Sequence, residues 1–213
     1  MKRGFILILT APSGAGKGVL SNHLIQSFRD IHFSISTTTR AIRPGEKLGV
    51  HYFFVGREEF ESMIAAQAFV EWAEVFGNFY GTQRQTLLES LEKGWDVILD
   101  IDWQGARQIR TQMRDDVVHI AIVPPSPEEL YRRLVARGQD SMEVIEKRMA
   151  LAERELSHWH EADYVVVNDR LEAACADVEA IVRAERLKRL RMAKKIEPLV
   201  ARFSNLFDGH HLA

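Results

Sequence analysis

A short apolar run, a glycine-rich loop and a helical pattern follow one another at the start of the chain. GFILILT (4–10) is apolar and branched, APSGAGKG (11–18) carries three glycines and a lysine, and apolar residues then recur at helical spacing from Val19 to Phe28. A loop between a strand and a helix can curl its backbone N–H groups around a phosphate, and the helix dipole adds positive potential. We therefore predict a phosphate-binding loop with Lys17 as its mobile cation. A glycine-rich turn before an ordinary helix is the alternative.

The loop departs from the general pattern G-x-x-x-x-G-K-[ST] at its two ends. Ala11 stands at the first position, and Gly18 stands where a hydroxyl would normally bind Mg²⁺. We therefore expect the Mg²⁺ that accompanies ATP to be held by nucleotide phosphates and water, with Asp100 acting through a water molecule. No residue is predicted with certainty to bind the metal directly.

The alternation of strand and helix recurs later in the chain. The expected strands are DVILDI (96–101), VVHIAIV (117–123) and DYVVV (163–167), and the helices that follow them are expected at 103–113, from Ser126, and at 170–192. This repetition predicts an α/β fold of three layers, with a parallel sheet covered on both faces. Between 35 and 93 the sequence pattern changes to short alternating and aromatic stretches. This change indicates an inserted, mixed α/β subdomain with a short helix at 57–66.

The expected organisation is one domain of five segments. We predict core with the phosphate loop at 1–34, the inserted subdomain at 35–93, core at 94–128, a helical lid at 129–158, and core with the C-terminal helix at 159–213. Ser126 begins the first lid helix, Gly138 ends it, and Asp140 with Glu143 resembles a cap for the second. The basic end of the last helix, 183–195, is expected to be a solvated face. The tail from about 196 receives no assignment.

Composition excludes several classes of protein. The 28 lysines and arginines nearly balance 30 aspartates and glutamates, so the net charge of −2 indicates neither a nucleic-acid nor a membrane partner. A single cysteine, Cys175, cannot form an internal disulfide, which favours a reducing cytoplasm. No apolar run approaches the roughly 18 residues that cross a bilayer. A homo-oligomer is left open, and a zinc site at His158 and His160 is not expected because further ligands at suitable spacing are missing.

Three further motifs, in this order and at these separations, carry a family resemblance. They are STTTRAIRPGEKLGVHYFF (36–54), FVEWAEVFGNFYGT (69–82) and ILDIDWQG (98–105). Together with the phosphate loop, they resemble guanylate kinase, a family of P-loop nucleoside monophosphate kinases. The resemblance extends from Gly4 to about Arg189. It implies a P-loop kinase core, a GMP-binding insertion and a lid.

Several residues of the insertion suit a guanine nucleotide. Arg40 and Arg43 lie three apart on a loop and offer planar forks to a phosphate dianion. Glu71 lies between apolar neighbours, and its carboxylate could accept from guanine N1–H and the exocyclic amine, whereas adenine presents an acceptor at N1. Solvated arginines and an edge-strand carboxylate are the alternatives. The GMP-binding residues that the resemblance implies are Ser36, Arg40, Arg43, Tyr52, Glu71, Tyr80, Thr82, Asp100 and Asp102.

Asp100 and Asp102 end a predicted strand and, two residues apart, project to the same face. A pair of turn-forming residues is the alternative. The resemblance places Asp100 near Lys17 and Mg²⁺, and Asp102 near guanine. It also implies that Arg137 and Arg148 cross the triphosphate when the lid closes, while Arg133 is left unassigned. The ATP-binding residues implied are Ala11, Pro12, Ser13, Gly14, Ala15, Gly16, Lys17, Gly18, Arg137 and Asn168, and the catalytic residues are Lys17, Arg40, Arg137 and Arg148.

The expected reaction is direct in-line transfer of the ATP γ-phosphoryl group to GMP, giving ADP and GDP, in purine nucleotide metabolism and GMP recycling. The acceptor phosphate is already anionic, so no general base is needed. One alternative is a kinase for another nucleoside monophosphate, which Glu71 argues against. The other is a non-catalytic guanylate-kinase-like module that binds phosphopeptides, which Lys17 and the lid arginines argue against.

Overall fold

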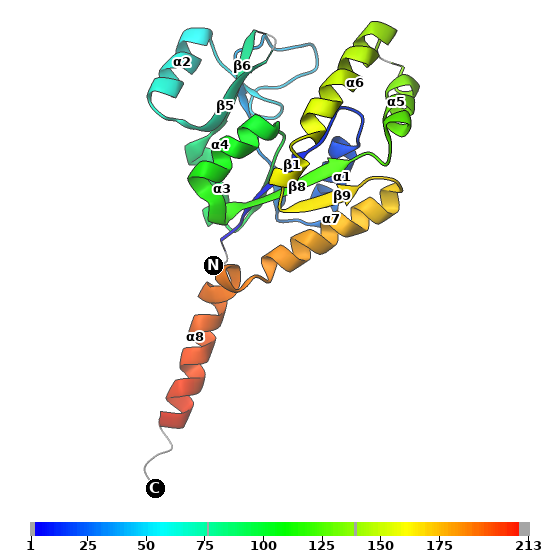
Figure 1. The fold of residues 1–213 in the computed structure, drawn as a ribbon. Coiled ribbons are helices and arrows are strands. Elements are labelled where there is room, and N and C mark those ends of the chain that lie inside the picture. Colours follow the sequence, from blue (N-terminus) through cyan, green and yellow to red (C-terminus); the bar gives the residue numbers. More distant parts are fainter. Residues whose placement is uncertain (1–2, 76, 139, 209–213) are drawn as a thin grey trace.

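A five-stranded parallel sheet forms the centre of the molecule (Figure 1). The computed structural model describes residues 3–75, 77–138 and 140–208, with side chains as far as 203. The strand order is β2 (Ile31–Phe33), β7 (Asp96–Leu99), β1 (Ile6–Thr10), β8 (Val117–Val123) and β9 (Tyr164–Val167). A parallel sheet is covered on both faces, which explains why β1, β7 and β8 are almost continuously apolar.

Helices cover both faces of this sheet. α1 (Lys17–Ser27) and α7 (Leu171–Arg186) pack on one face, where Leu20 and Val178 join a buried cluster with Leu7. α3 (Arg84–Glu92) and α4 (Trp103–Met113) pack on the other, where Leu87 and Ile109 meet neighbouring strand residues. The predicted three-layer α/β fold is therefore confirmed. β2 and α3 were not predicted, and both belong to the core although α3 lies within the segment assigned to the insertion.

The insertion has a small sheet of its own. Its strand order is β4 (Phe53–Phe54), β3 (Thr37–Thr38), β6 (Asn78–Gln83) and β5 (Phe69–Val75), with β5 at one edge. α2 (Arg57–Ala65) covers it through Phe60, which stacks on Phe69 and Phe79 at ring-centroid distances of 4.4 and 5.3 Å. The mixed α/β character and the short helix agree with the pattern in the sequence.

Two helices form the hairpin predicted as a lid. α5 (Pro127–Ala136) begins at Ser126, whose side chain accepts from the Glu129 N–H, and α6 (Met142–Leu156) follows. The cap of α6 differs from the prediction, because Ser141 accepts from the Val144 N–H at 3.4 Å. The Asp140 carboxylate instead accepts from Arg148 at 3.1 Å. The hairpin and the insertion stand at the same end of the molecule (Figure 1).

The single C-terminal helix predicted at 170–192 is instead two helices. α7 ends at Arg186, and α8 (Arg189–Asp208) projects from the body (Figure 1). Next to this break, the carboxylate of the fully buried Glu185 pairs with Lys188 at 2.6 Å and with Arg191 at 3.6 Å. The Lys188 side chain is 58% exposed, as expected for a solvated basic face, whereas that of Arg191 is only 10% exposed, so the prediction was wrong for Arg191. Two short 3₁₀ helices, η1 (Arg114–Asp116) and η2 (Trp159–Glu161), complete the secondary structure described.

Hydropathy along the described helices identifies none that could cross a bilayer.

The fold predicts a large stability cost for removing Asp96, a fully buried residue. Its carboxylate accepts from the Phe5 N–H at 3.1 Å and from Arg186 at 2.7 Å. We expect Asp96→Ala to lower the free energy of unfolding by about 2–4 kcal/mol, because the Phe5 amide loses its acceptor and Arg186 keeps only Asp30 as a partner. Urea unfolding would measure this. Asp116→Ala removes the more exposed pair with Arg3 and should cost less than about 1 kcal/mol. Equal costs for the two variants would contradict the assignment.

Candidate functional site

The glycine-rich loop joins β1 to α1 as predicted and is braced from β9. Gly14 and Gly16 have φ angles of 93° and 101°, a region that favours glycine. The buried Asn168 donates from Nδ2 to the Ala15 carbonyl at 2.8 Å, and a Cβ on Gly16 would lie only 2.3 Å from that nitrogen. Asn168, predicted to bind ATP, is thus a residue whose amide fixes the loop.

Lys17 and Asp100 meet at the carboxyl edge of the central sheet. Lys17 Nζ lies 2.5 Å from Asp100 Oδ1, and the Asp100 side chain is largely exposed beside it. Asp102, two residues on, is the N-cap of α4 and accepts from the Gly105 N–H at 2.9 Å. The structure therefore brings the loop lysine and both strand-end carboxylates together, as the sequence suggested.

A pocket of about 700 Å³ separates the insertion from the core and the lid. This volume is in the range of small-molecule sites. The predicted residues that line it are Ser36, Tyr52, Glu71, Tyr80, Asp100 and Asp102. Leu151 and Glu155 of α6 complete the wall on the side of the lid. The pocket shares Asp100 and Asp102 with a smaller hollow that reaches Lys17. A ligand bound in the pocket would therefore face the phosphate loop.

Glu71 is the most perturbed carboxylate in this pocket. Only 5% of the residue is exposed, and burial raises its pKa to about 6. The nearby Asp102 raises the pKa further, whereas a hydrogen bond from the Thr82 hydroxyl, 2.6 Å long, opposes the rise. Thr82, predicted as a base contact, is therefore the residue that orients Glu71. α4 approaches closely behind, since a Cβ on Gly105 would lie 3.2 Å from Glu71 Oε2.

Arg40 and Arg43, on one loop of the insertion, share an acidic partner that sequence reasoning missed. Arg40 donates to both carboxylate oxygens of Glu46 at 2.7 and 3.1 Å, and its guanidinium lies 5.3 Å from the centre of the Tyr52 ring. Glu46 also accepts from the Arg43 N–H at 2.8 Å, while the residue Arg43 is exposed. These hydrogen bonds, that from Arg40 foremost, lower the pKa of Glu46. The proline-glycine turn beside Arg43 was the available signal, because it returns the chain on itself.

One lid arginine already reaches the phosphate loop. Arg148 donates to the Ser13 hydroxyl at 2.8 Å and to Asp140 at 3.1 Å. Arg137 lies at the exposed C-terminal end of α5. Arg133 pairs with Glu129 at 2.7 Å, within its own helix. Arg148 is therefore in the position expected of a phosphate ligand, and Arg137 lies on the same hairpin.

Glu155 is a second residue that the sequence did not single out. It lies seven positions after Arg148 on α6 and lines both the pocket and the smaller hollow. Burial is the main cause of its raised pKa, which the nearby Lys17 opposes and Asp102 enhances. The spacing of seven residues, which puts Arg148 and Glu155 on one helix face, was the signal that could have identified it.

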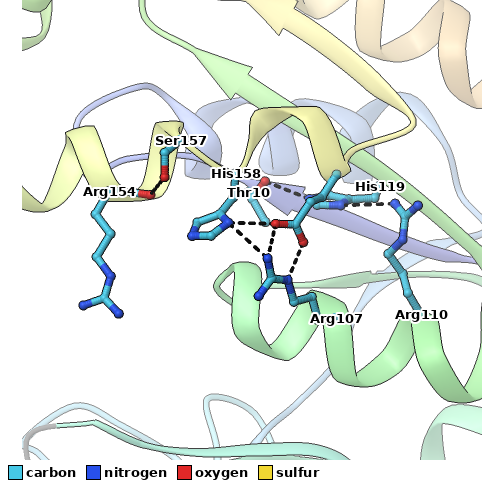
Figure 2. A network of polar contacts seen from close by, with 8 residues as sticks. Thr10, Arg107, Arg110, His119, Arg154, Ser157 and His158 are labelled. Atoms are coloured by element: carbon cyan, nitrogen blue, oxygen red, sulfur yellow. Dashed lines mark hydrogen bonds and ion pairs between the residues drawn. The ribbon is translucent and has the colours of Figure 1, made fainter.

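A polar network fastens the end of the lid to α4 (Figure 2). Glu161 of η2 accepts from Arg107 at 2.5 and 2.6 Å and contacts His158 at 2.7 Å, and the His158 ring stacks on Trp103. His158 is thus held by a carboxylate and an indole. This network therefore fixes the end of the helical hairpin to the core.

The fold and the pocket define a class of protein. The phosphate loop lies at the carboxyl edge of a parallel sheet. A second pocket faces its lysine, and a helical hairpin that carries arginines lies beside it. This is the arrangement of a P-loop kinase for small molecules.

Comparison with known proteins gives the family. A family model described as guanylate kinase matches residues 3–185. The chain is 54% identical over 202 residues to guanylate kinase of Vibrio parahaemolyticus, with 94% of this chain and 97% of that protein covered. It is 52% identical over 204 residues to guanylate kinase of Salmonella paratyphi A, with 95% and 98% covered. A crystal structure of guanylate kinase from Anaplasma phagocytophilum superposes with a TM-score of 0.70 at 41% identity, over 89% of this chain and 90% of that one. The chain belongs to the guanylate kinase family.

The environment of Glu71 predicts a stability gain when its charge is removed. A carboxyl pKa of about 6 in the folded protein, against an ordinary 4.5, costs roughly 2 kcal/mol once the pH exceeds 6. Below 4.5 both folded and unfolded states are protonated, so the cost disappears. We expect Glu71→Gln, which keeps an acceptor for Thr82, to raise the free energy of unfolding at pH 7.5 and to leave it unchanged near pH 4. Urea unfolding at both pH values measures the effect, with the exposed Glu74→Gln as the control. A gain that does not depend on pH would refute the mechanism.

Proposed function

We propose that this protein transfers the γ-phosphoryl group of ATP to GMP, giving ADP and GDP. The observation that carries the proposal is the position of Glu71, a buried carboxylate in a pocket that faces the lysine of the phosphate loop. Membership of the guanylate kinase family and the names of the relatives support the same activity.

Guanine suits the acidic side of the pocket. Its N1–H and exocyclic amine are adjacent donors, and Glu71 offers two carboxylate oxygens of which Oε1 already accepts from Thr82. Adenine would turn a lone pair toward the same carboxylate and leave it without a donor, which is the more costly arrangement. Ser36 and Asp102, on the same pocket wall, are the further base contacts in this proposal.

The phosphate of GMP would bind between the aromatic and basic side chains of the insertion. Tyr52 and Tyr80 line the pocket with ring centroids 6.0 Å apart, and the Arg40 guanidinium lies over Tyr52. Arg43, on the adjoining loop, would add a second guanidinium. Planar guanidinium groups and hydroxyl donors are well suited to a phosphate dianion.

The donor nucleotide would place its phosphates on the glycine-rich loop. Lys17, Arg137 and Arg148 are the cations proposed to neutralise charge on the transferred group, and the contact between Arg148 and Ser13 supports this for one of them. The GMP phosphate is itself the nucleophile, so the residues of this chain align two phosphates and exclude water. Arg40 would bind the phosphate of GMP, at the acceptor end of the two aligned phosphates.

Mg²⁺ is the cofactor in this proposal, and the residues beside the loop fit it. Asp100 offers an exposed carboxylate next to Lys17, while Gly18 offers no oxygen from a side chain. So small a protein donor set suits a cation that commonly keeps several waters and binds phosphate. When bound, Mg²⁺ would neutralise phosphate charge, and Asp100 would hold it through a water molecule.

The two alternatives are less well supported. A kinase for another nucleoside monophosphate would have no use for an acid as deeply buried as Glu71. A phosphopeptide-binding module would not need Lys17 paired with Asp100, or a lid arginine that contacts the loop. We place the reaction in the cytoplasm and in purine nucleotide metabolism, where ATP and GMP occur, and Cys175 as a free thiol is consistent with a reducing compartment.

An acceptor assay tests the proposal. With ATP and Mg²⁺ we expect ADP to form rapidly with GMP, far more slowly with AMP, UMP or CMP, and negligibly without an acceptor, because water is excluded. Glu71→Gln should lower kcat/KM for GMP by about 100-fold through loss of charge-assisted hydrogen bonds. Glu74→Gln on the same strand is the matched control. Fast hydrolysis of ATP alone, or equal turnover of all four acceptors, would overturn the assignment.

A second experiment tests how Mg²⁺ is held. A Cβ on Gly18 would meet nothing within 4 Å, so a larger side chain fits there. We expect Gly18→Ser to tighten the apparent Mg²⁺ affinity in the presence of ATP by about tenfold, because a hydroxyl replaces a water as ligand. Titration of activity with Mg²⁺ measures it, and Gly18→Ala controls for the backbone. An equal shift in both variants would show that the hydroxyl does not bind the metal.

A further inference from the structure

The outer edge of β5 is bound by side chains of α4. β5 is an edge strand whose ladder of hydrogen bonds joins it to β6 alone. An edge strand presents a row of unpaired backbone N–H and C=O groups on its other side. On this outer side β5 faces α4, a helix of the core that extends from the insertion to the central sheet.

Gln108 takes the place of a neighbouring strand. Its side-chain oxygen accepts from the Trp72 N–H at 3.2 Å, and its Nε2 donates to the Trp72 carbonyl at 3.1 Å. A residue of a paired strand would satisfy the same two backbone groups in the same way. One turn later, Gln112 donates to the Val70 carbonyl at 2.9 Å and accepts from Arg84. Two glutamines thus bind the residues on either side of Glu71.

The same helix carries the opposite wall of the acceptor pocket. α4 begins at Asp102, and its first turn brings Gly105 against the Glu71 carboxylate. The separation of Glu71 from Asp102 is therefore set by how β5 lies on α4. Gln108 is half-buried. Among the described residues, it makes the only pair of reciprocal hydrogen bonds between α4 and β5.

We infer that Gln108 is a positioning residue for guanine specificity. It holds β5 in register on α4, so that Glu71 and Asp102 face one nucleobase at a fixed spacing. Gln108 does not line the pocket and would not touch the nucleotide. The inference rests on the proposed function, and it adds a residue outside the acceptor cluster to the determinants of base choice.

The test compares variants in kinetics with each substrate varied in turn. Gln108→Met keeps the size and helical preference of the side chain but removes both hydrogen bonds. We expect KM for GMP to rise about fivefold or more while KM for ATP stays within about twofold, since two hydrogen bonds that fix one binding site are lost. The preference for GMP over IMP, which lacks the exocyclic amine, should fall as well. Thr111→Ala, on the exposed side of α4, is the matched control.

A second variant and a second measurement keep the inference testable. Gln108→Glu retains the acceptor for Trp72 N–H and loses only the donor, so it should show the same split between substrates, less strongly, even if the Met variant does not fold. Hydrogen exchange should show faster exchange of the Trp72 amide in both variants, while amides paired between β5 and β6 stay protected. Equal changes in both KM values, or an unchanged preference for GMP over IMP, would overturn the inference.

Failure of the proposed function would have a different signature. If the unaltered protein did not phosphorylate GMP, the function would be wrong, and hydrogen exchange would still decide whether Gln108 holds β5. If the unaltered protein phosphorylated GMP but the Gln108 variants bound both nucleotides normally, the function would stand and the positioning role would be wrong.

Discussion

The parallel pairing of β1 with β7 is the constraint on which the rest of the site depends. Ile8 lies opposite Leu99, the last residue of β7, and β1 continues for two more residues, so the chain leaves both strands at the same edge of the sheet. The loop after β1 leads to Lys17, and the residue after β7 is Asp100, which explains their ion pair. The segments that complete the pocket, the insertion and the lid, stand at this same end (Figure 1).

Burial and charge are balanced differently in the two halves of the site. On the acceptor side, Glu71 is held in surroundings that favour its neutral form, which is a cost in stability that a donor-rich ligand would relieve. On the donor side, backbone N–H groups and a helix N-terminus provide positive potential without burying an unpaired cation. The two sides of the candidate site therefore differ in polarity: one presents a buried carboxylate acceptor and the other presents backbone donors.

The elements with strong periodicity could be predicted from the sequence. The strand at 117–123 and the helix at 103–113 have the predicted bounds: the strand has a continuous apolar run, and the more polar helix followed from the alternation of strands and helices. β2 has three residues, and the apolar face of α3 is short, so neither gave a signal above its surroundings. The division between α7 and α8 gave no signal, because no glycine or proline lies between Arg186 and Arg189.

Within the candidate site, motifs selected several residues that line the pocket and missed others that contact them. Lys17, Glu71 and Asp100 lie where the motifs placed them, since each is fixed by its own strand or loop. Glu155 and Gln108 lie against other segments, so their positions depend on tertiary packing, whereas Glu46 contacts its own loop through a turn that the sequence analysis did not follow. Asn168, which the resemblance implied for ATP, also donates a hydrogen bond that braces the phosphate loop.

The ion pair between Arg40 and Glu46 has a consequence for which anions the acceptor pocket admits. With that guanidinium paired to Glu46, and Asp100 paired to Lys17, the wall of the cavity still carries the carboxylates of Glu71, Asp102 and Glu155. A free inorganic anion would be repelled there, because it offers nothing to Glu71 in exchange. In the role proposed for Arg40, the phosphate of a ligand must displace Glu46 from the guanidinium. Only a molecule that also donates hydrogen bonds to the opposite wall of the pocket can do so. The pocket would thus select ligands that bind through the nucleobase and the phosphate together.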